Sequence, residues 1–246
     1  MSGILKGIDQ NVTNVSSLVT RIGLFPNGYN PSRNEFTIPF LVQLKIGGEA
    51  VIASANAAKN VLQKMIALRI SEFTGFGSLI TRSVGALRIS GALPKVIEQG
   101  EAIVREIRGE RASNKHTEEE IAAAKEKGED LKNNTQHNAD FDSKVKNLGN
   151  YVTFLRTVDE YRPNEPDLTV DALAAKYQSL KTANDNCSTA ESTEKAVRLV
   201  RDNYMNDENT GLVDIALGVK SYVKSAYGAT SSQYKSISDL LFVKIK

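Results

Sequence analysis

The chain has 246 residues, of which 41% are hydrophobic and 24% charged, and its formal net charge is +2. This length suffices for a sizeable core without cross-links, and the single cysteine excludes an intramolecular disulfide bond. The net charge is too small to indicate a polyanionic partner: it is +5 over residues 1–100, −3 over 101–141 and 0 over 142–246, and the basic residues are dispersed.

Hydropathy predicts a soluble protein. The first residues lack the apolar run of about 7 to 15 residues that marks a secretory signal. No run of roughly 18 uninterrupted apolar residues occurs elsewhere. We therefore expect a cytoplasmic location, although the mature form of an exported protein would show the same features.

The first half of the chain predicts a short helix followed by a long one. Apolar residues three and four apart indicate an amphipathic helix over residues 9–24, namely Val12, Val15, Val19 and Ile22. The connector 25–34 contains proline and asparagine, which favour turns. A helix from Ile38 to Phe73 is predicted to follow, capped by Thr37. Gly47–Gly48 predicts a break or kink within it, because glycine costs about 1 kcal/mol in a helix interior.

A return helix and a terminal helix are predicted next. Thr74 can cap the return helix, and Gly75 permits a sharp reversal. Leu79 lies on the predicted core face, and Pro94 ends the helix. The short helix after it has apolar residues at helical spacing, namely Ile97, Ile103, Val104 and Ile107.

Residues 109–141 differ in character, since they are charged, rich in amides and almost without large apolar residues. Thr117 and Glu120 form a capping-box pattern, which predicts a helix start at this point. With few apolar residues to bury, the segment is either a solvated helical spacer or a mobile linker, and we favour the spacer.

The second half repeats the first. The pattern Y-x-P-x-x-x-[ED]-[FL]-T-[IV] occupies residues 29–38 and recurs 132 residues later at 161–170. Helices are accordingly predicted at 142–158, at 170–205 with Thr169 as cap, after Thr210-Gly211 with Ile215 matching Leu79, and near the end of the chain. We interpret this as an internal duplication, a pattern that decides architecture before any local motif does.

Residues with catalytic or metal-binding potential are few. His116 and His137 lie in the polar connector, and His137 has Asp140 and Asp142 nearby, but the spacing matches no established ligand set. Cys187 lies in the second long helix, opposite Ala55 of the first, without a histidine on the same element to activate a thiolate. An exposed polar segment and a half-buried helix residue are the favoured interpretations.

Other motifs also have simpler structural explanations. Residues 75–78 carry two glycines before a helix but lack the remaining features of a phosphate-binding loop, so a helix-to-helix turn is favoured. Residues 207–211 carry only part of a calcium-loop pattern. Tyr222, Tyr227 and Tyr234 alternate with lysines, which suits single-stranded nucleic acid, but packing is favoured. Asn-x-Ser/Thr triplets occur at a frequency expected by chance, at Asn11, Asn14, Asn133 and Asn186.

The sequence therefore predicts an all-α fold, an elongated helical bundle of two similar, duplicated units. The predicted domains are residues 1–108, a first helical repeat unit; 109–141, a charged and partly helical connector; and 142–246, a second repeat unit. We expect no enzyme and no catalytic, cofactor-binding or metal site. We expect a structural or interaction protein that assembles with itself or scaffolds another protein. The alternative is a soluble bundle that rearranges on membranes as a pore-forming protein.

Overall fold

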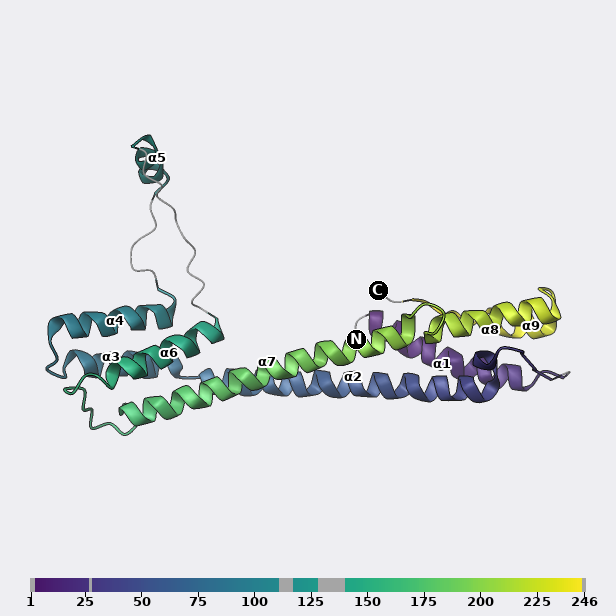
Figure 1. The fold of residues 1–246 in the computed structure, drawn as a ribbon, viewed down its shortest axis with the longest axis horizontal. Helices are drawn as coiled ribbons and strands as arrows, with labels where there is room; N and C mark the ends of the chain where they lie inside the picture. The colour runs from purple at the N-terminus through teal and green to yellow at the C-terminus, as the bar shows by residue number, and fades with distance from the viewer. Residues whose placement is uncertain (1–2, 27, 111–116, 128–139, 245–246) are drawn as a thin grey trace. The chain divides into compact units, whose positions relative to one another are not determined.

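The computed structural model describes residues 3–26, 28–110, 117–127 and 140–244, and within these ranges the fold is all-α (Figure 1). These residues form helices joined by turns and no β-strand. The elements are α1 (Gly3–Gly23), η1 (Asn34–Phe36), α2 (Ile38–Phe73), α3 (Phe76–Arg88), α4 (Pro94–Arg108), α5 (Glu118–Glu126), α6 (Phe141–Leu155), α7 (Val170–Asn206), α8 (Leu212–Tyr227) and α9 (Ser232–Ser238). The predicted fold class is confirmed for the described part of the chain.

The chain packs as two compact units. Unit 1 comprises Met1–Gln63 and Thr189–Lys246, and unit 2 comprises Lys64–Ser188. Unit 1 thus holds α1, η1, the first part of α2, the last part of α7, α8 and α9. Unit 2 holds the rest of α2 and α7 together with α3, α4, α5 and α6. Each unit draws helices from both halves of the sequence. The predicted division at 1–108, 109–141 and 142–246 follows similarity along the chain and stays a prediction.

The core of unit 1 lies among α1, α8, α9 and the start of α2 (Figure 1). The predicted face of α1 is buried, with Leu18 added to it, and Val19 is only partly buried. Facing it are the apolar residues of the later helices, among them Leu212, Ile215, Ala216, Val219, Val223 and Ile237. Burial of these side chains, at about 25 cal/mol per Å² of apolar surface, stabilises the unit.

Unit 2 has its own core, formed by α3, α4 and α6 with the first turns of α7 (Figure 1). Its fully buried residues include Ile80, Leu87, Leu148, Tyr151, Leu173 and Leu180. Leu79 was predicted to match Ile215 of unit 1 as a core residue. Ile215 is 3% exposed, but Leu79 is only partly buried, so the two positions differ in burial.

The two long helices have the same pattern of buried positions. α2 has 36 residues and begins and ends as predicted, and α7 has 37 residues, ending one residue later than predicted. Buried residues recur every seven positions in both, as Leu41, Gly48 and Ala55 in α2 and Leu173, Leu180 and Cys187 in α7. This repeat is typical of helices that pack lengthwise.

The break predicted at Gly47–Gly48 is wrong, since α2 is helical through both glycines. A β-carbon at Gly47 would collide with the ring and hydroxyl of Tyr204, and one at Gly48 would lie 2.9 Å from the Val12 side chain. The glycines therefore let α7 and α1 approach the backbone of α2. The packing gained offsets their low helix propensity.

The two proline-bearing connectors share one contact. The Tyr29 hydroxyl donates to the Phe36 carbonyl at 2.9 Å, and the Tyr161 hydroxyl donates to the Leu168 carbonyl at 2.8 Å. Each tyrosine thus bonds to the backbone seven residues further on. This bond closes the turn that leads into each long helix.

Two of the predicted helix caps are confirmed. Thr117 accepts from the Glu120 amide at 3.2 Å, and the Glu120 carboxylate accepts from the Thr117 amide at 3.0 Å, which completes the capping box of α5. Thr169 accepts from the Ala172 amide at 3.2 Å at the start of α7. For Thr37 the structure shows a donation instead, from its hydroxyl to the Asn34 carbonyl.

The cap predicted at Thr74 is wrong, and Thr210 in the equivalent place does not cap its helix either. The N-cap residues of α3 and α8 are Gly75 and Gly211, and neither helix start has a side-chain cap bond. Gly75 has a φ of 76°, a conformation that glycine adopts without strain. The Thr74 hydroxyl instead donates to the Ile70 carbonyl within α2.

Candidate functional site

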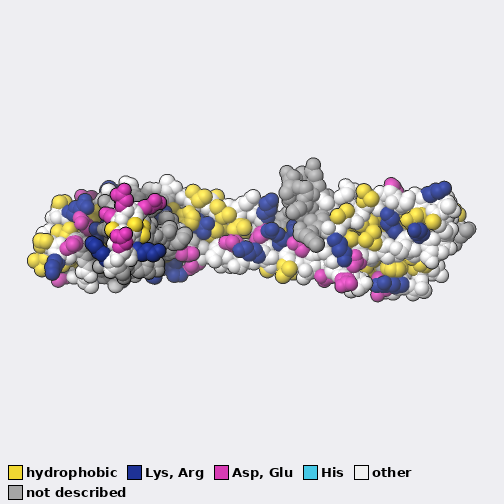
Figure 2. All heavy atoms as spheres, turned by 90° about the horizontal axis from the view of Figure 1, so that it is seen from above, with side chains coloured by type: hydrophobic (Ala, Val, Ile, Leu, Met, Phe, Trp, Pro, Cys, Tyr) yellow, Lys and Arg dark blue, Asp and Glu magenta, His cyan; other side chains and the backbone are white. Residues whose placement is uncertain are grey.

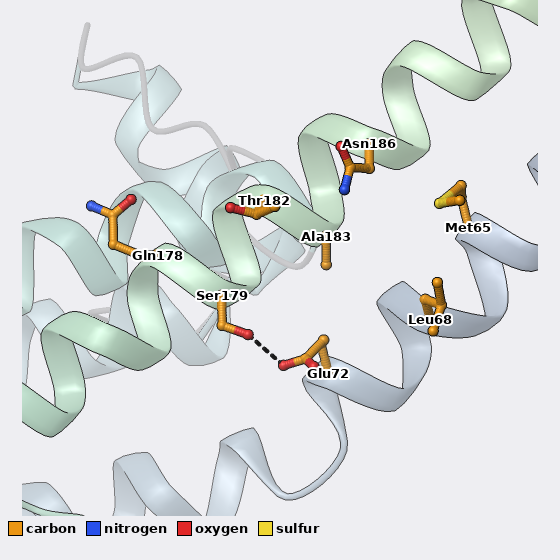
Figure 3. Close-up of a pocket in the computed structure, with 8 residues that line it drawn as sticks. All are labelled: Met65, Leu68, Glu72, Gln178, Ser179, Thr182, Ala183 and Asn186. Atoms are coloured by element: carbon orange, nitrogen blue, oxygen red, sulfur yellow. Dashed lines mark hydrogen bonds between the residues drawn. The ribbon is translucent and has the colours of Figure 1, made fainter.

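A groove of ≈ 390 Å³ lies in unit 2 between the end of α2 and the first half of α7 (Figure 3). Its lining residues are Met65, Leu68 and Glu72 from α2 and Gln178, Ser179, Thr182, Ala183 and Asn186 from α7. Most of the α7 residues are small and polar. The groove therefore offers hydrogen-bonding groups along one wall and two apolar side chains on the other.

Glu72 is the charged residue of this groove. Its carboxylate accepts from the Ser179 hydroxyl at 2.6 Å, as drawn in Figure 3, and from Lys176 Nζ at 3.1 Å. These interactions hold the pKa of Glu72 below its ordinary value, and the hydrogen bond from Ser179 has the larger effect. The carboxylate is thus ionised and engaged at neutral pH, which suits a positioning role rather than proton transfer.

A second depression, of ≈ 460 Å³, adjoins this groove and shares Ser179 with it. Phe76 and Leu79 line its apolar part, and Arg82 pairs with Asp167 beside them. Because both partners of this ion pair are about half exposed, it contributes little to stability. The ion pair also leaves the surface locally neutral, so it does not favour a ligand of either charge.

A buried polar network lies behind this surface. The Ser83 hydroxyl is 3.2 Å from the Tyr151 hydroxyl and 2.9 Å from the Tyr161 hydroxyl. Burial raises the pKa of Tyr151 to about 12 and also raises the pKa of Tyr161. Both phenols are therefore neutral at physiological pH and supply no base that could activate Ser83. The network joins α3, α6 and the connector that precedes α7.

The remaining sequence candidates fall into structural positions or outside the described residues. Cys187 is 2% exposed and faces the interior of the packed helices. His116 and His137 lie outside the described residues. Among the residues that the structure does describe, no group of three or more His, Cys, Asp or Glu side chains is arranged to hold a metal ion. Within the segment 75–78, Gly75 belongs to the turn between α2 and α3, and residues 76–78 begin α3.

The C-terminal tyrosines secure the first connector. The Tyr222 hydroxyl donates to the Asn30 carbonyl at 2.9 Å, and the Tyr227 hydroxyl donates to the Gly28 carbonyl at 2.6 Å. Tyr29 meets Tyr222 edge to face, with ring centroids 5.6 Å apart. The interpretation of these tyrosines as packing residues is confirmed, and their partners nearly 200 residues away were not predictable from the local pattern.

The segment that follows α9, residues 240–244, is bound along α1 and α8 in unit 1; we call it the docked segment. Asn14 Nδ2 donates to the Leu241 carbonyl at 2.6 Å, and Asn11 Nδ2 donates to the Val243 carbonyl at 2.8 Å. The Val243 amide donates back to Asn11 Oδ1 at 3.1 Å. Lys220 Nζ donates to the carbonyl of Leu240 at 2.7 Å. The segment is thus held through its backbone.

Side chains of the docked segment alternate between core and solvent. Leu240 and Phe242 are 5% and 8% exposed, whereas Leu241 and Val243 are 71% and 59% exposed. This alternation is the period of a β-strand, although the hydrogen-bonding partners are side chains of a helix. Sequence reasoning missed the asparagines that bind this segment.

Comparison with known proteins found no similar protein. No protein-family model matches the chain, and neither a curated protein nor a solved structure is detectably similar to it. By length and composition, one helical segment of the described residues, Ile38–Arg88, is apolar enough to cross a membrane, and 22% of its most apolar window is buried.

Proposed function

We propose that this chain is a non-enzymatic interaction protein, built from two copies of one helical module, that associates with itself through an apolar helix face of unit 1. Three features support the proposal: the repeated connector contact, the chemical difference between counterpart faces of α2 and α7, and the structural engagement of the reactive side chains.

The equivalence of the halves rests on contacts as well as residue types. Tyr29 and Tyr161 make the same backbone bond 132 residues apart. In the long helices, the buried positions Leu41 and Leu173 are separated by the same offset. A module that once associated as two chains and was then fused would keep such matched contacts.

The counterpart of the Figure 3 groove is apolar. The α2 residues of the groove, moved 132 positions forward, correspond to Val197, Val200 and Tyr204. The α7 residues, moved 132 positions back, correspond to Ile46, Gly47, Ala50, Val51 and Ser54, and all these counterparts lie in unit 1. The ring of Tyr204 covers Gly47, and its hydroxyl donates to the Leu44 carbonyl at 2.8 Å. Aromatic and aliphatic groups thus occupy positions where unit 2 has a carboxylate, an amide and hydroxyls.

The observation that carries the proposal is the exposure of this apolar face. Ile46 is 48% exposed and Val200 is 59% exposed, and Leu199 beside Val200 is 61% exposed. Figure 2 shows that other parts of the visible surface intersperse apolar, basic and acidic side chains without a stripe of one charge. Large aliphatic side chains exposed on regular helices are a recognised feature of protein–protein contact surfaces.

The state of the reactive side chains does not favour an enzymatic function. Glu72 is paired, the phenols of Tyr151 and Tyr161 are neutral, and Cys187 is buried. A catalytic site needs a nucleophile or base with a free partner in a pocket. The described side chains instead serve contacts between helices, as expected for a binding module.

Light scattering across a concentration series, at two ionic strengths, tests the proposal. The variant Ile46→Glu/Val200→Glu should raise the concentration for half-association at least about tenfold, equivalent to roughly 1.4 kcal/mol. The matched control is Leu68→Glu/Gln178→Glu, which places the same charges at the counterpart positions of unit 2. This control should associate like the natural chain.

Two results would contradict the proposal. One is a natural chain that stays strictly monomeric at every concentration and salt condition. The other is an equal loss of association in both double variants, which would show that added charge rather than the unit 1 face is responsible. Circular dichroism of each variant checks that the helices remain folded.

A second candidate function follows from the apolar composition of Ile38–Arg88, of whose most apolar window 22% is buried. On this alternative, the long helix leaves its bundle and inserts into a bilayer as a pore-forming protein does. Dye release from liposomes of neutral and anionic lipids, at acidic and neutral pH, tests it. Absence of release under all these conditions would eliminate the candidate.

A further inference from the structure

We propose that the surface of α1 and α8 in unit 1 is a binding site for an extended peptide with apolar residues at alternate positions, and that it exchanges its own docked segment for the same segment of a second copy. This site is separate from the apolar face of α2 and α7. The inference does not depend on the duplication.

The site is built to bind a peptide backbone. Asn11 and Asn14 are 2% and 8% exposed, and both direct side-chain amides at the docked segment. Asn11 makes a two-way contact with Val243, in which the amide Nδ2 donates to the carbonyl and Oδ1 accepts from the backbone N–H. These bonds recognise the backbone in its extended form and do not depend on the identity of the exposed side chains.

Specificity comes from the two inward positions. Leu240 and Phe242 insert into the core of unit 1, whereas Leu241 and Val243 face solvent. A ligand for this site therefore needs large apolar residues two positions apart. Lys244 adds an ion pair with Asp214 at 2.8 Å, which fixes the direction of the segment.

Buried asparagines make an empty site unfavourable. If the docked segment leaves, the amides of Asn11 and Asn14 lose their backbone partners, and the apolar surface covered by Leu240 and Phe242 is exposed. The site thus favours occupation by some extended segment. The second copy supplies a segment of identical sequence, so every contact can be remade between molecules.

Release of the segment is energetically accessible. Only two apolar side chains are inserted, and this gain is set against the entropy of ordering five residues. The segment follows α9 directly, and Asp239 at the junction pairs with Arg21 on the surface. Exchange of such a short element between identical chains is a known route to association.

The test uses the full-length chain and a fluorescent peptide of residues 238–246. In the variant Leu240→Ala/Phe242→Ala, the chain's own segment competes poorly, so the peptide should bind this variant at least tenfold more tightly than the natural chain. Adding Asn14→Ala should weaken binding about fivefold, the effect of losing one hydrogen bond.

Two peptide variants provide the matched control. A peptide with Leu241→Asp/Val243→Asp changes only the exposed positions and should retain most of its binding. A peptide with Leu240→Asp/Phe242→Asp changes only the inserted positions and should not bind. Equal binding of the two, or no binding of the unmodified peptide to the folded variant, would overturn the site.

A second measurement requires no protein variant. Saturating unmodified peptide, added to the natural chain in light scattering, should shift associated chains toward monomer. A mass unaffected by peptide, or a strictly monomeric chain, would overturn exchange between copies. The Ile46→Glu/Val200→Glu variant separates the two proposals, since loss of association there without any effect of peptide assigns the contact to the α2–α7 face.

Discussion

The matched tyrosines allow one prediction that compares the two connectors. Tyr161→Phe should destabilise the chain by about 2 to 4 kcal/mol, and Tyr29→Phe by about 0.5 to 1.5 kcal/mol. Tyr161 is 4% exposed, and its hydroxyl lies 2.8 Å from the Leu168 carbonyl and 2.9 Å from the Ser83 hydroxyl. Removing it takes partners from two buried groups. Tyr29 is only partly buried and has one such bond, to the Phe36 carbonyl at 2.9 Å.

Urea unfolding, followed by circular dichroism and tyrosine fluorescence, measures this difference. The slope of the free energy of unfolding against urea should be the same for both variants, because neither substitution changes the buried surface appreciably. Tyr161→Phe should then unfold at a clearly lower urea concentration than Tyr29→Phe. Equal midpoints, or a larger effect at Tyr29, would refute the assignment of the extra cost to the Ser83 network.

Three further predictions concern unit 2. Burial raises the pKa of Tyr151 from 10.0 to about 12, so the folded state holds this proton more tightly. The resulting stability is complete below the unfolded pKa and is lost as the pH rises through the folded one. Tyr151→Phe should therefore flatten the alkaline part of a stability–pH curve. Gly100→Ala should destabilise by about 1 to 3 kcal/mol because its β-carbon would collide with packed side chains. Gly85→Ala, which has open space, should stabilise by about 0.5 to 1 kcal/mol in thermal melts.

Local chemistry was sufficient to predict the helices. α2 and α7 begin where predicted because a proline-bearing connector ends in a threonine, and Thr169 forms the expected cap. The α5 start followed from a capping box whose partners are three residues apart. These features are short-range, so the residues that decide them are adjacent in sequence.

Contacts across long sequence separations were not predictable in the same way. From the sequence, Gly47 was predicted to weaken the helix. The structure shows that a glycine is required there because the Tyr204 ring of α7 packs against its backbone. In the sequence, Asn11 and Asn14 were noted only as parts of Asn-x-Ser/Thr triplets that occur by chance. Their hydrogen-bond partners lie 232 and 227 residues away. A single sequence shows composition and period, but it does not show which helix faces meet.

Some residues match between the two halves of the sequence and others differ, and the two groups lie in different places. The residues that set the backbone are the same in both halves, as in Tyr29 and Tyr161, because a turn closed by one phenol tolerates few replacements. The residues on the open faces differ, and Tyr204 stands where the other half has Glu72. On the proposed duplication, a face that served only solvation would have had no reason to become apolar in one unit and polar in the other. On this proposal, the asymmetry is the reason to expect that charge substitutions on the unit 1 face, rather than on its counterpart, weaken association.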